Sequence, residues 1–135
     1  MADRLHSAAI RLLRRLRAQD RAAGIGPAQL SALSVLVFGG PCSLKQLAEA
    51  EQVRPPTMSR IAAGLRRAGL VRAEAVGADR RKLRLVPTAK GIQVMQQGRR
   101  RRVQQLARAL RTFPENKVRR LGHAAETIFE LVRRL

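Results

Sequence analysis

The pattern of hydrophobic and polar positions is most informative between Ser43 and Pro87. Apolar residues recur at helical spacing in two neighbouring segments, residues 44–50 and 55–68, and a polar Glu51-Gln52 pair separates them. Apolar and polar residues then alternate with period two on both sides of a glycine-containing tip at residues 77–81. This order predicts two helices joined by a turn and followed by a β-hairpin. A helix-turn-helix with such a hairpin presents one helix to a groove of DNA.

Local signals define the ends of these two helices. Ser43 and Gln46 have the spacing of a capping box, in which each side chain bonds the backbone N–H of the other. Pro55 suits the first turn of the second helix, and Gly69 suits the residue that ends it. The second helix is therefore expected to run from Pro55 to about residue 68. Its inward face is expected to consist of Met58, Ile61, Ala62, Leu65 and Ala68.

The two ends of the chain carry apolar stripes of their own. In the C-terminal segment, apolar residues follow one another at spacings of 3 and 4 over Val118, Leu121, Ala125, Ile128, Val132 and Leu135. The N-terminal segment repeats the pattern at Leu5, Ala9, Leu12 and Leu16. Heptad spacing is typical of helices that pack lengthwise against other helices. Two alternatives remain: packing only within their own domain, or pairing with a second copy of the chain.

Residues 88–112 are predicted to form a long connecting helix, interrupted by the run Arg99 to Arg102. Four successive helical residues point in four directions, and burying an unpaired charge is costly. We therefore expect the middle of this helix to lie largely open to water. The run is either a solvated charge cluster or a contact for phosphate groups.

Several motifs together resemble the MarR family of bacterial transcription factors, over nearly the whole chain. They are Gly26-Pro27-Ala28-Gln29-Leu30, Leu47-Ala48, the segment from Val53 to Arg60, Leu65, Gly69-Leu70-Val71, Asp79-Arg80-Arg81 and Thr88-Ala89-Lys90-Gly91. The resemblance implies a mostly α fold with a small β-wing, a winged helix-turn-helix that dimerises through its terminal helices. It divides the chain into an N-terminal dimerisation helix (1–25), the DNA-binding unit (26–87), and a connecting helix with a C-terminal dimerisation helix (88–135).

The resemblance also implies which residues contact DNA. Arg60 is expected to bond a base edge and Arg81 to enter the minor groove, with Asp79 as a brace for the wing arginines. The expected DNA-binding set is Ser43, Arg54, Pro55, Pro56, Thr57, Ser59, Arg60, Arg80 and Arg81. The expected dimerisation set is Leu5, Leu12, Leu16, Val118, Leu121, Ala125, Ile128 and Val132. Arg54 departs from the family, which usually has Ser or Thr at this helix cap. The alternative for the arginines is ordinary solvated surface.

The amino-acid composition agrees with a polyanionic partner such as DNA. The 135 residues include 28 Lys and Arg against 9 Asp and Glu, a net charge of +19. The charge is not confined to the DNA-binding unit, because residues 88–135 alone carry 12 basic and 3 acidic side chains. There is no Trp or Tyr to stack on RNA bases. No apolar stretch has the roughly 20 residues of a membrane span.

Enzymatic chemistry is not expected. His6, His123 and the single Cys42 stand apart from one another, so no metal site, nucleophile–base pair or cofactor motif is predicted. One cysteine fits a reducing cytoplasm. The sequence therefore predicts a homodimeric, sequence-specific DNA-binding regulator, a repressor on a pseudo-palindromic operator, with release by a small-molecule effector implied by the resemblance. The alternative is a sequence-tolerant, nucleoid-type DNA-binding protein.

Overall fold

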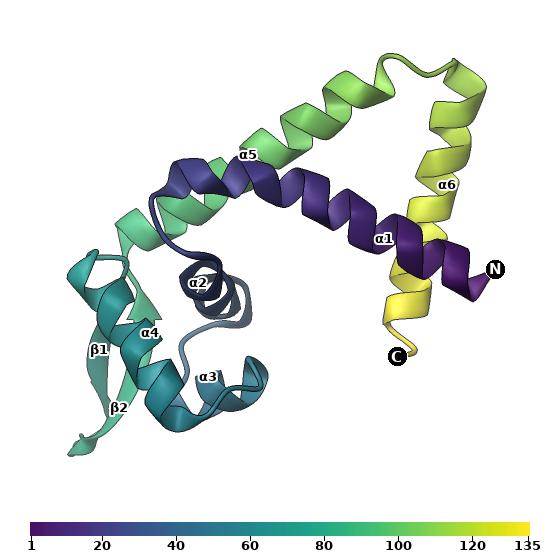
Figure 1. Cartoon of the computed structure of the whole chain (residues 1–135). Coiled ribbons are helices and arrows are strands. Elements are labelled where there is room, and N and C mark those ends of the chain that lie inside the picture. Colours follow the sequence, from purple (N-terminus) through teal and green to yellow (C-terminus); the bar gives the residue numbers. More distant parts are fainter. The chain divides into compact units, whose positions relative to one another are not determined.

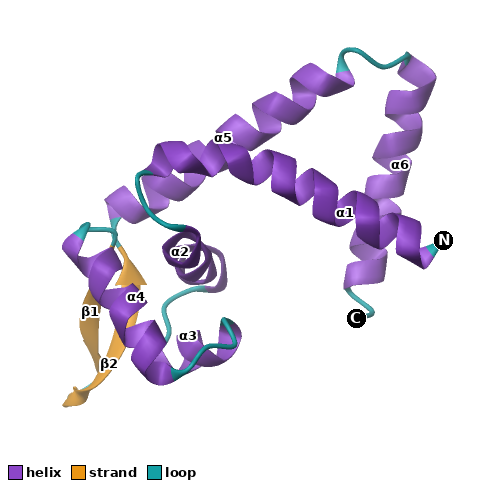
Figure 2. Ribbon diagram, viewed as in Figure 1, coloured by secondary structure: helices purple, strands orange, loops and turns teal.

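The computed structural model describes the backbone of residues 1–135 and every side chain except those of Gln19, Arg21 and Ala22. The chain divides into two compact units, Met1–Arg100 and Arg101–Leu135. The elements are helices with one hairpin (Figures 1 and 2). In chain order they are α1 (Ala2–Arg17), the 3₁₀ helix η1 (Ala18–Ala23), α2 (Pro27–Gly39), α3 (Leu44–Ala50), α4 (Pro55–Arg67), β1 (Val71–Val76), β2 (Asp79–Pro87), α5 (Ala89–Leu110) and α6 (Glu115–Val132).

The core lies where α2, α3, α4 and the base of the hairpin meet. Its largest fully buried side chains are Leu33, Leu36, Leu47, Met58 and Leu65. Helix α2 is apolar around most of its circumference, because it packs against both α3 and α4. Burial of these side chains supplies the main stabilising term of the unit. It also fixes which face of α4 points away from the core.

The helix ends form as their local sequence predicts. The Ser43 hydroxyl accepts a bond from Gln46 N at 3.1 Å, and Gln46 Oε1 accepts one from Ser43 N at 2.9 Å. Both α3 and α4 end in the Schellman arrangement, in which the two residues after the cap bond back into the last turn. Gly69 takes the left-handed conformation after α4, with φ +71°, and Gln52 takes it after α3, with φ 54°.

A second set of contacts joins the end of α4 to the start of α5. The Thr88 hydroxyl donates to Gly69 O at 2.6 Å and accepts from Gly91 N at 3.1 Å. Lys90 Nζ donates to Ala68 O at 2.9 Å. At Gly91 an added Cβ would lie 2.2 Å from Leu70 O, so only glycine allows this approach. The Thr-Ala-Lys-Gly motif therefore holds α5 against the end of the helix-turn-helix.

The hairpin, called the wing below, differs from the prediction at its tip and along its inner face. The turn consists of Gly77 and Ala78 alone, and Asp79 already belongs to β2. Of the apolar residues in β2, Leu85 is buried whereas Leu83 is 51% exposed. The reason is that the wing projects past α2, α3 and α4, so only its base contacts the core.

The arginine run in α5 agrees only in part with the expectation of open solvent. Arg99 and Arg100 are exposed, but Arg101 and Arg102 are half-buried. Burial reaches the guanidinium group of Arg101, whose Nε is buried and makes no hydrogen bond to any described residue. The expectation that the middle of this helix lies largely open to water holds for Arg99 and Arg100 and does not hold for Arg101 and Arg102.

The terminal helices leave their apolar stripes open in the single chain. Neither α1 nor α6 has a buried residue. Four residues of the expected dimerisation set are exposed: Leu12, Leu121, Ile128 and Val132. Ile10, Leu13, Phe129 and Leu131 are also exposed, and the heptad pattern did not include them. Within the described residues, no helix is long and apolar enough to cross a membrane.

Candidate nucleic-acid interface

Helix α4 presents a polar and basic face to solvent. Met58, Ala62 and Leu65 are buried, and their spacing turns Ser59 and Arg60 outward. Pro55, Pro56 and Arg54 at its start are exposed, and Thr57 is half-buried. Arg54 stands at the cap position and makes no side-chain cap bond there. The start of α4 therefore carries an exposed, uncapped helix end beside an exposed arginine.

The tip of the wing carries two further exposed arginines, Arg80 and Arg81. Asp79 Oδ1 accepts bonds from Arg81 N at 3.0 Å and from Arg81 Nε at 3.2 Å. The Arg81 side chain nevertheless stays 93% exposed. Asp79 thus holds the near end of the guanidinium while its outer edge remains in solvent, where it can reach another molecule.

The sequence-based prediction missed an ion-pair cluster on the wing. Glu74 Oε1 accepts a bond from Arg72 Nε at 3.0 Å, and Glu74 Oε2 accepts one from the Arg84 guanidinium at 3.2 Å. The hydrogen bonds from Arg72 and then Arg84 lower the pKa of the Glu74 carboxyl, so the carboxylate is charged at neutral pH. Glu74 and Arg84 are direct partners across the hairpin. Counting outward from the Gly77-Ala78 turn would set Glu74 opposite Arg81 instead, because the register shifts between Ala75 and Val76, so the sequence alone could not identify this pair.

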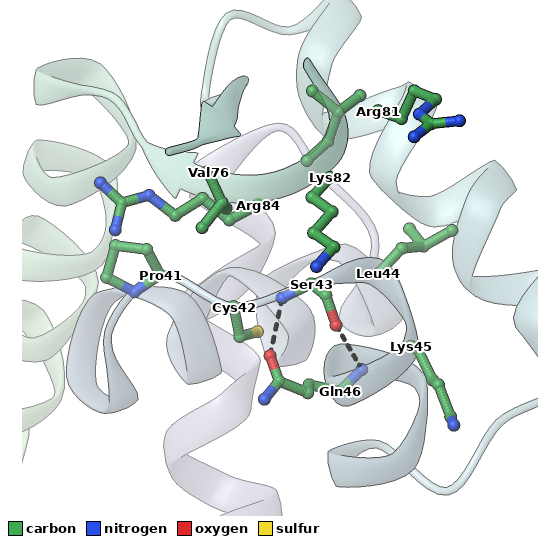
Figure 3. Close-up of a pocket in the computed structure, with 11 residues that line it drawn as sticks. Pro41, Cys42, Ser43, Leu44, Lys45, Gln46, Val76, Arg81, Lys82 and Arg84 are labelled. Carbon is green, nitrogen blue, oxygen red and sulfur yellow. Dashed lines mark hydrogen bonds between the residues drawn. The ribbon is translucent and has the colours of Figure 1, made fainter. Parts of the chain in front are cut away.

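An open groove of about 570 Å³ lies between the start of α3 and strand β2 (Figure 3). Four of its lining residues are cationic and none is acidic. The lining consists of Pro41, Cys42, Ser43, Leu44, Lys45, Gln46, Val76, Arg81, Lys82, Leu83 and Arg84. The groove brings Ser43 and Arg81, two predicted DNA-binding residues, to one surface. Lys45, Lys82 and Arg84 were not predicted, because their proximity depends on tertiary packing.

Cys42 lines this groove, but its surroundings do not activate it. Its backbone pairs with Leu85, with Leu85 N donating to Cys42 O at 2.8 Å. Partial burial raises the pKa of the Cys42 thiol above its usual value. A thiol with a raised pKa is protonated at neutral pH and is a weak nucleophile. The geometry fits a packing role at the base of the wing. No three His, Cys, Asp or Glu side chains in the described part of the chain could hold a metal ion.

A helix-turn-helix whose second helix and following wing both expose arginine is a winged helix of the DNA-binding class. The model of the MarR family matches residues 23–82. An uncharacterized HTH-type transcriptional regulator of Mycobacterium leprae is 34% identical over 132 residues, which cover 98% of this chain and 92% of the relative. An HTH-type transcriptional regulator of Mycobacterium tuberculosis is 33% identical over the same shares. The chain belongs to the MarR family of transcriptional regulators.

Solved structures share the fold. A transcriptional regulator from Thermotoga maritima superposes with a TM-score of 0.87 at 23% identity, over 98% of this chain and 94% of that one. A putative transcriptional regulator from Pseudomonas aeruginosa gives a TM-score of 0.80 at 26% identity, over 99% and 93%. The predictions of the family and of a mostly α winged helix-turn-helix are confirmed.

Proposed function

We propose that this MarR-family regulator acts as a homodimeric repressor, in the cytoplasm, on a pseudo-palindromic DNA operator. The observation that carries the proposal is the joint exposure of basic residues on α4 and on the wing of one compact unit. The family membership supports transcriptional regulation, and it alone supports release of the operator by a small-molecule effector.

Helix α4 is the proposed reader of sequence in the major groove. Arg60 is exposed on its outward face and can donate two hydrogen bonds to the O6 and N7 atoms of guanine. Ser59 and Thr57 are short hydroxyl donors suited to phosphates or bases, and Pro55 and Pro56 offer apolar contact to a thymine methyl. The two helices of a dimer would then reach half-sites about one helical turn, ~34 Å, apart.

The wing is the proposed minor-groove contact. A narrow minor groove concentrates negative potential, which attracts an inserted arginine. Arg81 is almost fully exposed, and its two bonds to Asp79 limit the directions that its side chain can take. We assign Asp79 the role of orienting Arg81, because a carboxylate would itself repel phosphate.

Dimerisation is assigned to residues 1–25 and 88–135, with α1 and α6 as the contact elements. Most of their apolar side chains are exposed in the single chain, with Val132 at 60%, whereas Leu5, Leu16 and Val118 are half-buried. Contiguous exposed apolar surface on a helix marks an interaction site. The alternative is that α6 packs only within its own domain. Residues 26–87 remain the proposed DNA-binding unit.

A nucleoid-type role is the second candidate, because the net charge of +19 alone supports binding to any duplex. The test is to recover genomic fragments that the purified protein retains at moderate salt, and to measure the dissociation constants for a retained fragment and a scrambled one. Specific regulators bind their sites roughly 10³ to 10⁷ times more tightly than other DNA. A ratio near one would reject the repressor and favour the nucleoid-type protein.

A further inference from the structure

The groove between α3 and the wing has two lysines whose charges are not balanced within the chain. Of its four cations, Arg81 is paired with Asp79 and Arg84 with Glu74. Lys45 and Lys82 have no acidic partner among the described residues. These two lysines belong to different elements, α3 and β2. In Figure 3 the Lys82 side chain extends from β2 toward the segment at Ser43. Lysines therefore lie on both walls of the groove, and in Figure 3 the Lys45 side chain extends from α3 away from Lys82.

The walls between these charges are apolar and open. Val76 is 46% exposed and Leu83 is 51% exposed, and both line the groove with Leu44 and Pro41. Large apolar side chains exposed together mark a contact surface. Alternating apolar wall and positive charge suits a ligand that alternates in the same way, such as a chain of sugars and phosphates.

We propose that the groove holds the sugar-phosphate backbone of one DNA strand, with Lys45 and Lys82 binding phosphate oxygens from opposite walls. The inference rests on the proposed DNA-binding function and names two positioning residues for it. Lysine ammonium groups are compact charges with three donors, suited to phosphate without a fixed angle. Arg81 lies at the same groove, so a strand held there would pass directly beside the wing tip. These contacts position the protein and carry no base preference.

The test is a set of DNA titrations at several salt concentrations with K45Q/K82Q. Each lost phosphate contact lowers the slope of log affinity against log salt by about 0.9, and a dimer loses four of them, so the slope should fall by about 3.6. The loss of affinity between 50 and 200 mM salt should then be roughly a hundredfold smaller than in the unchanged protein. The preference for operator over scrambled DNA should stay the same. K45R/K82R keeps both charges and should restore the slope.

The matched control is R133Q/R134Q, which removes two exposed charges at the end of α6. It should leave the salt slope within error of the unchanged protein. An unchanged slope in K45Q/K82Q would overturn the inference, and so would an equal fall in both double variants, because the effect would then follow net charge. Failure of the proposed function would give a different result, in which the unchanged protein binds operator and scrambled DNA equally well. K45Q/K82Q would still lower the salt slope in that case, so the two failures are distinguishable.

Discussion

At the scale of single residues, the structure depends on a few backbone positions with strict requirements. The capping box at Ser43, the proline at the start of α4 and Gly69 after it were predictable, because their partners lie within a few residues. The roles of Thr88 and Lys90 were not, because their hydrogen-bond acceptors lie 19 and 22 residues earlier in the chain. The Thr-Ala-Lys-Gly motif can be recognised from the sequence alone, but the hydrogen bonds that explain it are seen only in the folded chain.

Gly91→Ala tests this junction. The added Cβ would lie 2.2 Å from the backbone oxygen of Leu70, so α5 must shift away from the end of α4. We expect a loss of about 1–3 kcal/mol in the free energy of unfolding, measured by urea denaturation. Gly39→Ala is the control, because nothing lies within 4 Å of its added Cβ. It should be neutral or stabilise by up to ~1 kcal/mol. Equal stability of the two variants would contradict the contact at Leu70.

At the scale of elements, the wing shows what the alternation of apolar and polar residues can predict about a hairpin and what it cannot. Period-two alternation predicted both strands, but it could not tell that only the base of the wing contacts the core. That difference left Leu83 exposed and created a wall of the groove. The groove itself joins segments about 40 residues apart, so it depends on the packing of α3 against β2. The Arg84–Glu74 ion pair depends on the register shift between Ala75 and Val76, whereas Arg72 and Glu74 lie two residues apart on β1.

Glu74→Gln should strengthen binding to DNA of any sequence. Glu74 pairs with Arg72 and Arg84, and its removal leaves two wing cations without their acidic partner. More positive charge near phosphates releases more counterions, and a dimer carries the change twice, so the salt slope should steepen by up to about 2. Glu130→Gln makes the same change of charge at an exposed site on α6. If both variants changed the slope equally, Glu74 would have no local effect on the wing.

At the scale of the whole molecule, the exposed apolar residues on α1 and α6 are the basis for the proposed dimer. The heptad spacing predicted part of each face, and the structure adds Ile10, Leu13, Phe129 and Leu131. A sequence pattern identifies a surface that needs a partner, but it does not identify the partner.

The double variant L121D/I128D should convert the protein from a dimer to a monomer of 15.0 kDa. Two carboxylates in an apolar contact lose their hydration without gaining a partner. Sedimentation equilibrium should report the monomer mass, and operator binding should fall with it. The control N116D/T127D places the same charges on exposed polar positions of α6 and should remain a dimer. A dimeric L121D/I128D protein would show that α6 does not form the interface.

The most direct test of sequence reading compares Arg60→Ala with Arg81→Ala, titrated against operator and scrambled DNA at several salt concentrations. Arg60→Ala should cost ~1–3 kcal/mol on the operator and relax the preference at one base pair per half-site. Arg81→Ala should weaken binding, lower the salt slope and leave the major-groove preference nearly intact. If both variants weakened operator and scrambled DNA by the same factor, neither residue would read sequence, and the nucleoid-type alternative would hold.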